Sequence, residues 1–137
     1  MDIIKKFIEN DSFAAYLGIE ILEHSNGSAK AKMKISEHHL NSAGTVHGGA
    51  IFSLADAVFA VASNSYGTLA MAVNVSISYF KAVREGTLFA EAEEVSINPK
   101  LATYLVHIKD QNKNEIALFQ GTVYKKSDTL ESILLKP

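Results

Sequence analysis

A polar, glycine-rich stretch, Asn41-Ser-Ala-Gly-Thr-Val-His47-Gly48-Gly49, comes directly before an apolar segment that carries a single carboxylate. From Ala50 to Ser63 the chain reads AIFSLADAVFAVAS, and Asp56 is the only ionisable residue in it. Aspartate is a mediocre helix former, and a carboxylate in apolar surroundings is costly unless a partner stabilises it. Catalysis is therefore the leading hypothesis for Asp56.

The glycines before this segment suit the binding of a carbonyl oxygen. A helix N-terminus presents unpaired backbone N–H groups and a partial positive charge. Glycine at positions 48 and 49 lets a substrate carbonyl approach those donors closely, because no side chain stands in the way. The pattern therefore predicts an electrophilic site at the start of the helix, eight residues before the carboxylate of Asp56.

Other kinds of chemistry are disfavoured by composition and spacing. The chain has no cysteine, which excludes disulfides, thiolate catalysis and zinc ribbons. His38 and His39 are adjacent, so on an extended segment their side chains point to opposite faces, and we expect no metal site. A net charge of -2 gives no reason to expect nucleic acid or an anionic membrane as partner.

The pattern along the chain predicts one α+β domain over residues 1–137, in the cytoplasm by default. A short amphipathic helix is expected at about 2–10, a hairpin around the turn Ser25-Asn26-Gly27, and a buried helix at about 48–64. Four strands should follow as an antiparallel meander, and the tail 127–137 is expected to be frayed. The four predicted strands span 71–79, 87–97, 100–110 and 115–126.

These elements match the hot-dog fold, in which a curved antiparallel sheet of five or six strands wraps around a central apolar helix. The motif N-x-x-G-x-x-H-G-G, followed after six residues by Asp56, resembles the signature of hot-dog acyl-CoA thioesterases of the PaaI-like family. The resemblance extends from about Gly18 to Lys126. It implies hydrolysis of an acyl-CoA to a free acid and coenzyme A, with no metal or redox cofactor.

The same resemblance assigns roles to the motif. It makes the backbone N–H of Gly48 the donor that polarises the thioester carbonyl, and Asp56 the general base or nucleophile. Asn41 and His47 become positioning groups, and Gly49 a substrate-binding residue. The family builds each site across a dimer interface, which implies a homodimer and, beyond it, a dimer of dimers.

Some assignments stay open on the sequence. Many relatives carry Ser or Thr where this chain has Ala72, and Asn74 is expected on the same strand face as a substrate-binding residue. Lys81, Arg84 and Lys100 could meet the phosphates of coenzyme A.

Blander interpretations compete with the catalytic ones. Asn41 could be a loop-turn residue, His47 a hydrogen-bonding group at the helix start, and Gly49 a packing residue. The alternative function is a non-catalytic acyl-CoA binding or sensing module. A hot-dog hydratase is disfavoured because the His-Gly-Gly pattern lacks a nearby proline, and a purely structural dimer would leave Asp56 unexplained.

Overall fold

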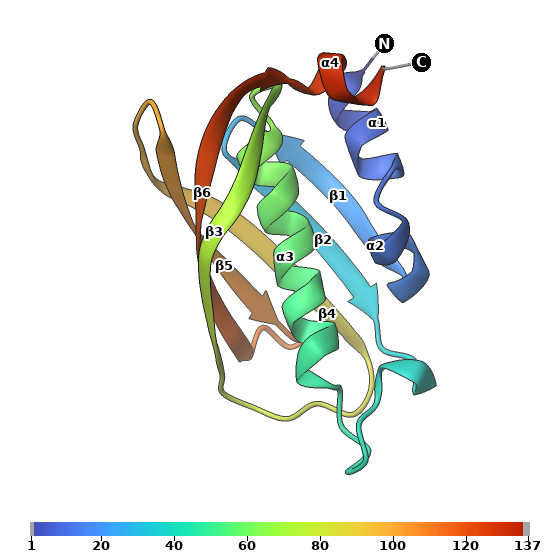
Figure 1. Cartoon of the computed structure of the whole chain (residues 1–137). Helices are drawn as coiled ribbons and strands as arrows, with labels where there is room; N and C mark the ends of the chain where they lie inside the picture. Colours follow the sequence, from blue (N-terminus) through green and yellow to red (C-terminus); the bar gives the residue numbers. More distant parts are fainter. Residues whose placement is uncertain (1, 136–137) are drawn as a thin grey trace.

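One long helix, α3, lies against the concave face of a curved antiparallel sheet (Figure 1). The computed structural model describes residues 2–135. The helices are α1 (Ile3–Glu9), α2 (Ser12–Leu17), α3 (Gly48–Asn64) and α4 (Leu130–Leu134), with a 3-10 turn at Glu37–His39. The strands are β1 (Ile19–Ser25), β2 (Ser28–Lys34), β3 (Thr68–Tyr79), β4 (Thr87–Ile97), β5 (Leu101–Lys109) and β6 (Glu115–Thr129). The hot-dog architecture and its six strands are confirmed.

The strand order is β1-β2-β4-β5-β6-β3, so the predicted four-strand meander is wrong in one respect. β3 pairs with β6 at the far edge of the sheet and not with β4, the next strand along the chain. β4 instead pairs with β2, and this pairing joins the N-terminal hairpin to the rest of the sheet. A hairpin between β3 and β4 would have left β2 without this neighbour. The predicted hairpin turn is present, with Gly27 at a φ of 79°.

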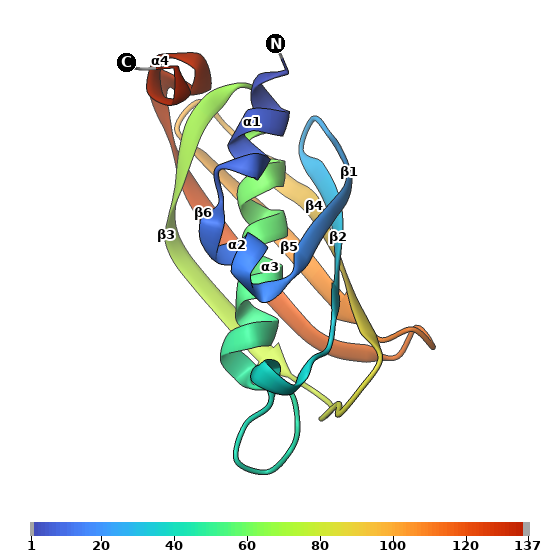
Figure 2. The ribbon, with the colours of Figure 1, turned by 90° about the vertical axis from the view of Figure 1, so that its right-hand side faces the viewer.

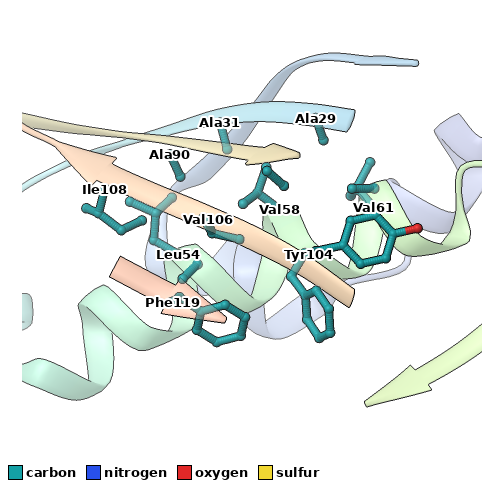
Figure 3. Packing of buried hydrophobic residues seen from close by; sticks show 14 of the residues in the cluster. Ala29, Ala31, Leu54, Val58, Val61, Ala90, Tyr104, Val106, Ile108 and Phe119 are labelled. Carbon is teal, nitrogen blue, oxygen red and sulfur yellow. The ribbon is translucent and has the colours of Figure 1, made fainter. Parts of the chain in front are cut away.

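The core lies between α3 and the concave face of the sheet (Figure 3). Leu54, Val58 and Phe59 of α3 are almost fully buried against it. Gly121 on β6 shows how closely the helix approaches, because a Cβ added there would lie 2.6 Å from the Phe59 ring. Small side chains on β2 and β4, among them Ala31, serve the same close approach.

The buried side chain of Asn64 joins the end of α3 to the start of β3. Its amide group donates to the carbonyl oxygens of Ala60, at 2.9 Å, and Ala70, at 3.2 Å. Its carbonyl oxygen accepts from the backbone N–H of Ala70 at 2.9 Å. Because both backbone groups of Ala70 are satisfied by one side chain, Asn64 sets where the edge strand begins.

α1 and α2 pack on the side of α3 that faces away from the sheet (Figure 2). Asp2 and Asp11 cap these helices by accepting hydrogen bonds from backbone N–H groups of their first turns. The expected frayed tail is instead ordered through residue 135: β6 continues to Thr129, and α4 follows. Leu130 is buried, and its N–H donates to the carbonyl oxygen of Gly67 at 2.9 Å, which fixes the start of α4. Residues 136 and 137 of the expected tail lie outside the described residues.

β3 is a long edge strand with apolar side chains open to solvent. It spans twelve residues, and Met71 and Val73 are 50% and 60% exposed. An unpaired strand edge of this length is a ready template for pairing with another chain. Among residues 2–135, no helix is both long and apolar enough to cross a bilayer.

Candidate active site

The loop before α3 is held in shape by Asn41. Its side-chain carbonyl oxygen accepts hydrogen bonds from the backbone N–H groups of Ala43 and Thr45, at 3.0 and 3.1 Å. Its amide nitrogen donates to the Thr45 hydroxyl at 2.9 Å. Asn41 therefore serves the loop within this chain, as the blander interpretation expects, and its amide keeps one further hydrogen for another acceptor.

His47 caps α3, and this cap leaves one backbone donor free. The Nδ1 atom of His47 accepts from the N–H of Gly49 at 2.8 Å, while its backbone oxygen accepts from Ala50 and Ile51. This bond places the ring proton on Nε2. Within residues 2–135, nothing accepts a hydrogen bond from the N–H of Gly48. The first turn of α3 therefore offers a single unpaired N–H, on the residue that the motif singled out.

Gly49 leaves room for this cap. A Cβ at Gly49 would lie 3.0 Å from Nδ1 of His47, closer than side-chain atoms normally approach. Its carbonyl oxygen accepts from the Ser53 hydroxyl at 2.7 Å. Gly49 therefore contributes to the shape of the helix start, and it also lines the groove described below.

Tyr79, the last residue of β3, contacts the first residue of α3. Its hydroxyl donates to the carbonyl oxygen of Gly48 at 2.9 Å, across 31 positions of the chain. The ring lies so close that a Cβ at Gly48 would be 3.2 Å from the hydroxyl oxygen. Nothing in the spacing of the aromatic residues relates Tyr79 to Gly48, so the sequence offers no signal for this contact.

Asp56 lies on a strip of α3 that no element of the single chain covers. The expectation of a buried helix therefore holds for most residues of α3 but not for this strip. Asp56 is exposed, yet the surrounding protein partly desolvates its carboxylate and raises its pKa; the negative charge of Asp11 raises it further. No local pattern in the sequence relates Asp11 to Asp56, since their proximity arises from tertiary packing.

Gly48 and Asp56 cannot act on the same carbonyl within one chain. Eight residues of helix separate them by about 12 Å along the helix axis. A general base and an oxyanion donor must both lie about 3 Å from the reacting group. A mechanism that uses both residues on one carbonyl would therefore take them from two copies of the chain.

A groove of about 560 Å³ lies beside the start of α3. His47, Gly49, Phe52 and Tyr79 line it together with Phe13 of α2, so the free N–H of Gly48 is next to a concave and largely aromatic surface. Phe13 is 62% exposed in the single chain. Such a groove is suited to an apolar ligand with a few polar groups.

Only some of the cations predicted to bind the substrate lie near the start of α3. Arg84 donates to the carbonyl oxygens of Ala43 and Gly44, so it braces the loop before α3. Lys81 lies near Asp110 in the turn between β5 and β6, and its charge contributes to the lowered pKa of Asp110, behind the larger effect of hydrogen bonds from Asn114.

A bulge in β3 places Asn74 on a different face of the sheet from the one expected. The register shifts between Ala72 and Asn74, so that Ala72 is opposite Val123 but Asn74 is opposite Thr122. Val123 points into the core and Thr122 does not, which places Ala72 and Asn74 on opposite faces of the sheet. The prediction of a shared face assumed unbroken alternation. In the part of the chain that is described, no three His, Asp or Glu side chains gather as a metal site.

Comparisons with known proteins agree on one family. The family model of the thioesterase superfamily matches residues 43–117, more than half of the chain. A putative esterase of Archaeoglobus fulgidus is 50% identical over 121 residues, which cover 88% of this chain and 79% of that relative. The acyl-coenzyme A thioesterase PaaI of Escherichia coli is 35% identical over 123 residues, covering 89% of this chain and 88% of that protein.

Solved structures give the same result. The E. coli PaaI structure superimposes with a TM-score of 0.88 at 33% identity and covers 91% of each chain. A structure of the phenylacetic acid degradation protein PaaI from Thermus thermophilus, a mutant form, superimposes with a TM-score of 0.82 at 35% identity, covering 85% of this chain and all of that one.

Proposed function

The chain belongs to the thioesterase superfamily as a PaaI-like hot-dog thioester hydrolase, and we propose that its substrate is an acyl-CoA, cleaved at a site shared between two subunits. The unpaired N–H of Gly48 is the observation that carries this proposal. It is the one free donor in the first turn of α3, and it lies beside an apolar groove. A donor fixed in this way stabilises the oxygen of a thioester as negative charge develops on it.

In this mechanism the Gly48 N–H polarises the thioester carbonyl, and Asp56 supplies the second function. Burial and the charge of Asp11 raise its pKa, which makes the carboxylate a better base than an ordinary aspartate. Asp56 either removes a proton from the attacking water or attacks the acyl carbon itself. His47 positions the Gly48 peptide through the helix cap, and the remaining amide hydrogen of Asn41 holds the water or the thioester.

The site is completed by a homodimer formed along the edge of β3. The separation of about 12 Å between Gly48 and Asp56 on one helix supports this arrangement, because each carbonyl must then meet Gly48 of one subunit and Asp56 of the other. The exposed apolar side chains and unpaired backbone groups of β3 supply the surface for pairing. Two such dimers then associate as a tetramer.

The phosphates of coenzyme A require cations at the mouth of the site. Lys100 lies at the β4–β5 turn beside Lys125 and Lys126, around a shallow depression. Arg84 and Lys81 lie at the opposite end of β3, near the start of α3. In a two-fold dimer paired along β3, the Lys100 end of one subunit faces the Gly48 end of the partner, so both groups of cations can serve one substrate.

The first test measures thiol release from a panel of acyl-CoAs by wild type and by Asp56→Asn. The chain has no cysteine to react with the thiol reagent. We expect Asp56→Asn to lower kcat by about 100-fold or more with the dimer intact. Binding of acyl-CoA without turnover would favour the non-catalytic module, an alternative that Ala72 keeps open since it has no hydroxyl to orient water.

A second test asks whether the site is shared. Asp56→Asn and Gly48→Pro, each inactive alone, are mixed in equal amounts under conditions of subunit exchange. Half of the dimers are then mixed, and each has one intact site of two, so we expect recovery of about a quarter of wild-type activity. No recovery despite proven exchange would show that each site lies within one chain.

A further inference from the structure

A smaller cavity of about 100 Å³ opens on the other side of Asp56, between α3, α2 and β1. Its walls are mostly apolar, and Glu9 and Asp11 contribute polar atoms to them. Ala57, Ala60 and Val61 of α3 form one side, and Ala14 of α2 and Ile19 of β1 form the other. The small side chains on both helices create this space, because larger ones would fill it.

Asp56 does not itself line the cavity, but it lies on α3 next to residues that do. Ala60 follows Asp56 by four residues, so the two lie on the same face of α3, one turn apart. Asp11 lines the cavity and is also close enough for its charge to act on Asp56. A thioester whose acyl carbon lies at Asp56 therefore has this cavity within reach of its acyl chain.

The size of the cavity limits what it can hold. An apolar cavity of about 150 Å³ accommodates benzene, and this one is smaller. Its volume corresponds to about three water molecules, or to a similar number of methylene groups. A short aliphatic chain fits this space, whereas a phenyl ring would be confined more tightly than benzene is in that larger cavity.

The charges at the cavity restrict the ligand further. The only ionisable residues that line it are Glu9 and Asp11, both exposed where the cavity meets solvent. Asp56 next to it is a third carboxylate. An acyl group that ends in a second carboxylate would meet like charges here and would lose its hydration on entering an apolar space.

We propose that this cavity binds the acyl chain of the substrate and selects short, uncharged aliphatic acyl groups of about four carbons over aromatic and dicarboxylic ones. The inference rests on the proposed function. The cavity and Asp56 belong to one subunit, while Gly48 of the partner subunit polarises the carbonyl.

The panel for the test is acetyl-, butyryl-, hexanoyl-, phenylacetyl- and succinyl-CoA. We expect kcat/KM to rise about fourfold for each methylene buried, so that butyryl-CoA exceeds acetyl-CoA by about 15-fold. Phenylacetyl- and succinyl-CoA should be poorer substrates than butyryl-CoA. Faster hydrolysis of either would overturn the inference while leaving the hydrolase intact, whereas hydrolysis of none would instead count against the proposed function.

Ala60→Leu tests where the acyl chain lies. The larger side chain fills the cavity, so we expect kcat/KM for butyryl- and hexanoyl-CoA to fall by about tenfold or more while acetyl-CoA changes little. Ala14→Leu narrows the cavity from α2 and should lower the same two kcat/KM values. It replaces Ala60→Leu in the test if that variant folds poorly. Phe13→Ala, in the groove at the start of α3, should leave the chain-length profile unchanged. The opposite pattern would place the acyl group in that groove.

Asp11→Asn tests the charge argument. Asparagine retains the helix cap of α2, so we expect the ratio of succinyl-CoA to butyryl-CoA activity to rise about fivefold. Asp2 is the matched control, because it caps α1 in the same way but does not line the cavity. An equal ratio in Asp11→Asn, Asp2→Asn and wild type would refute the selection by charge.

Discussion

Replacing Gly48 by proline removes the backbone N–H that we assign to the oxyanion and should disturb the backbone little. Gly48 is the first residue of α3, where proline is favoured because that N–H is unpaired in any helix. The residue before a proline must be extended, and His47 already has φ -59° and ψ 136°. The helix start is therefore compatible with proline.

The expected loss follows from the bond that disappears. Removing one oxyanion donor costs about 100- to 1000-fold in kcat, or about 3–4 kcal/mol. Proline also adds a Cβ, which would lie 3.2 Å from the hydroxyl oxygen of Tyr79. Gly48→Ala adds the same Cβ and keeps the N–H, so it isolates the contribution of the donor. We expect Gly48→Ala to retain at least a tenth of wild-type kcat.

The assay is thiol release at saturating acyl-CoA, with thermal unfolding and oligomeric state measured for all three proteins. A large drop in kcat for proline alone, at similar stability, supports the assignment. If the proline and alanine variants are equally active, the Gly48 N–H does not stabilise the transition state, and our reasoning about the start of α3 is incorrect.

Three further changes test the surroundings of the site. Tyr79→Phe removes the hydrogen bond to the first carbonyl of α3, and we expect kcat to fall by about three- to tenfold with KM little changed, measured by thiol release. Asp11→Asn removes a negative charge that raises the pKa of Asp56; because the base acts when ionised, the acid limb of the pH–rate profile should move to lower pH. Asn64→Ala leaves the buried backbone groups of Ala70 unpaired and should lower the free energy of unfolding by about 2–4 kcal/mol in urea denaturation.

Each of these changes has a matched control elsewhere in the chain. Tyr66→Phe removes a hydroxyl bond of the same 2.9 Å length, to Glu94 and not to the start of α3, and should lower kcat less than Tyr79→Phe does. Asp2→Asn should not move the pH profile, and the exposed Asn114→Ala should cost little stability. Equal effects of a test variant and its control would refute the corresponding prediction.

Local pattern was sufficient to predict much of the fold. Apolar periodicity marked the helix expected at about 2–10, an apolar run rich in alanine marked the one at about 48–64, and the Asn26-Gly27 pair marked the hairpin. These signals depend on residues within a few positions of one another, where backbone preference and the side-chain period dominate. The spacing of Gly48 and Asp56 likewise singled out the two residues on which the proposed chemistry depends.

Partners distant in sequence were decided only by the tertiary structure. β3 pairs with β6 instead of β4, and a bulge after Ala72 turns Asn74 to the other face. Asp11 reaches Asp56, and Tyr79 reaches Gly48, only because α2 and β3 pack beside the same helix. Such contacts depend on how the whole chain buries its apolar surface and satisfies its backbone, and this total is not encoded in any local stretch of sequence.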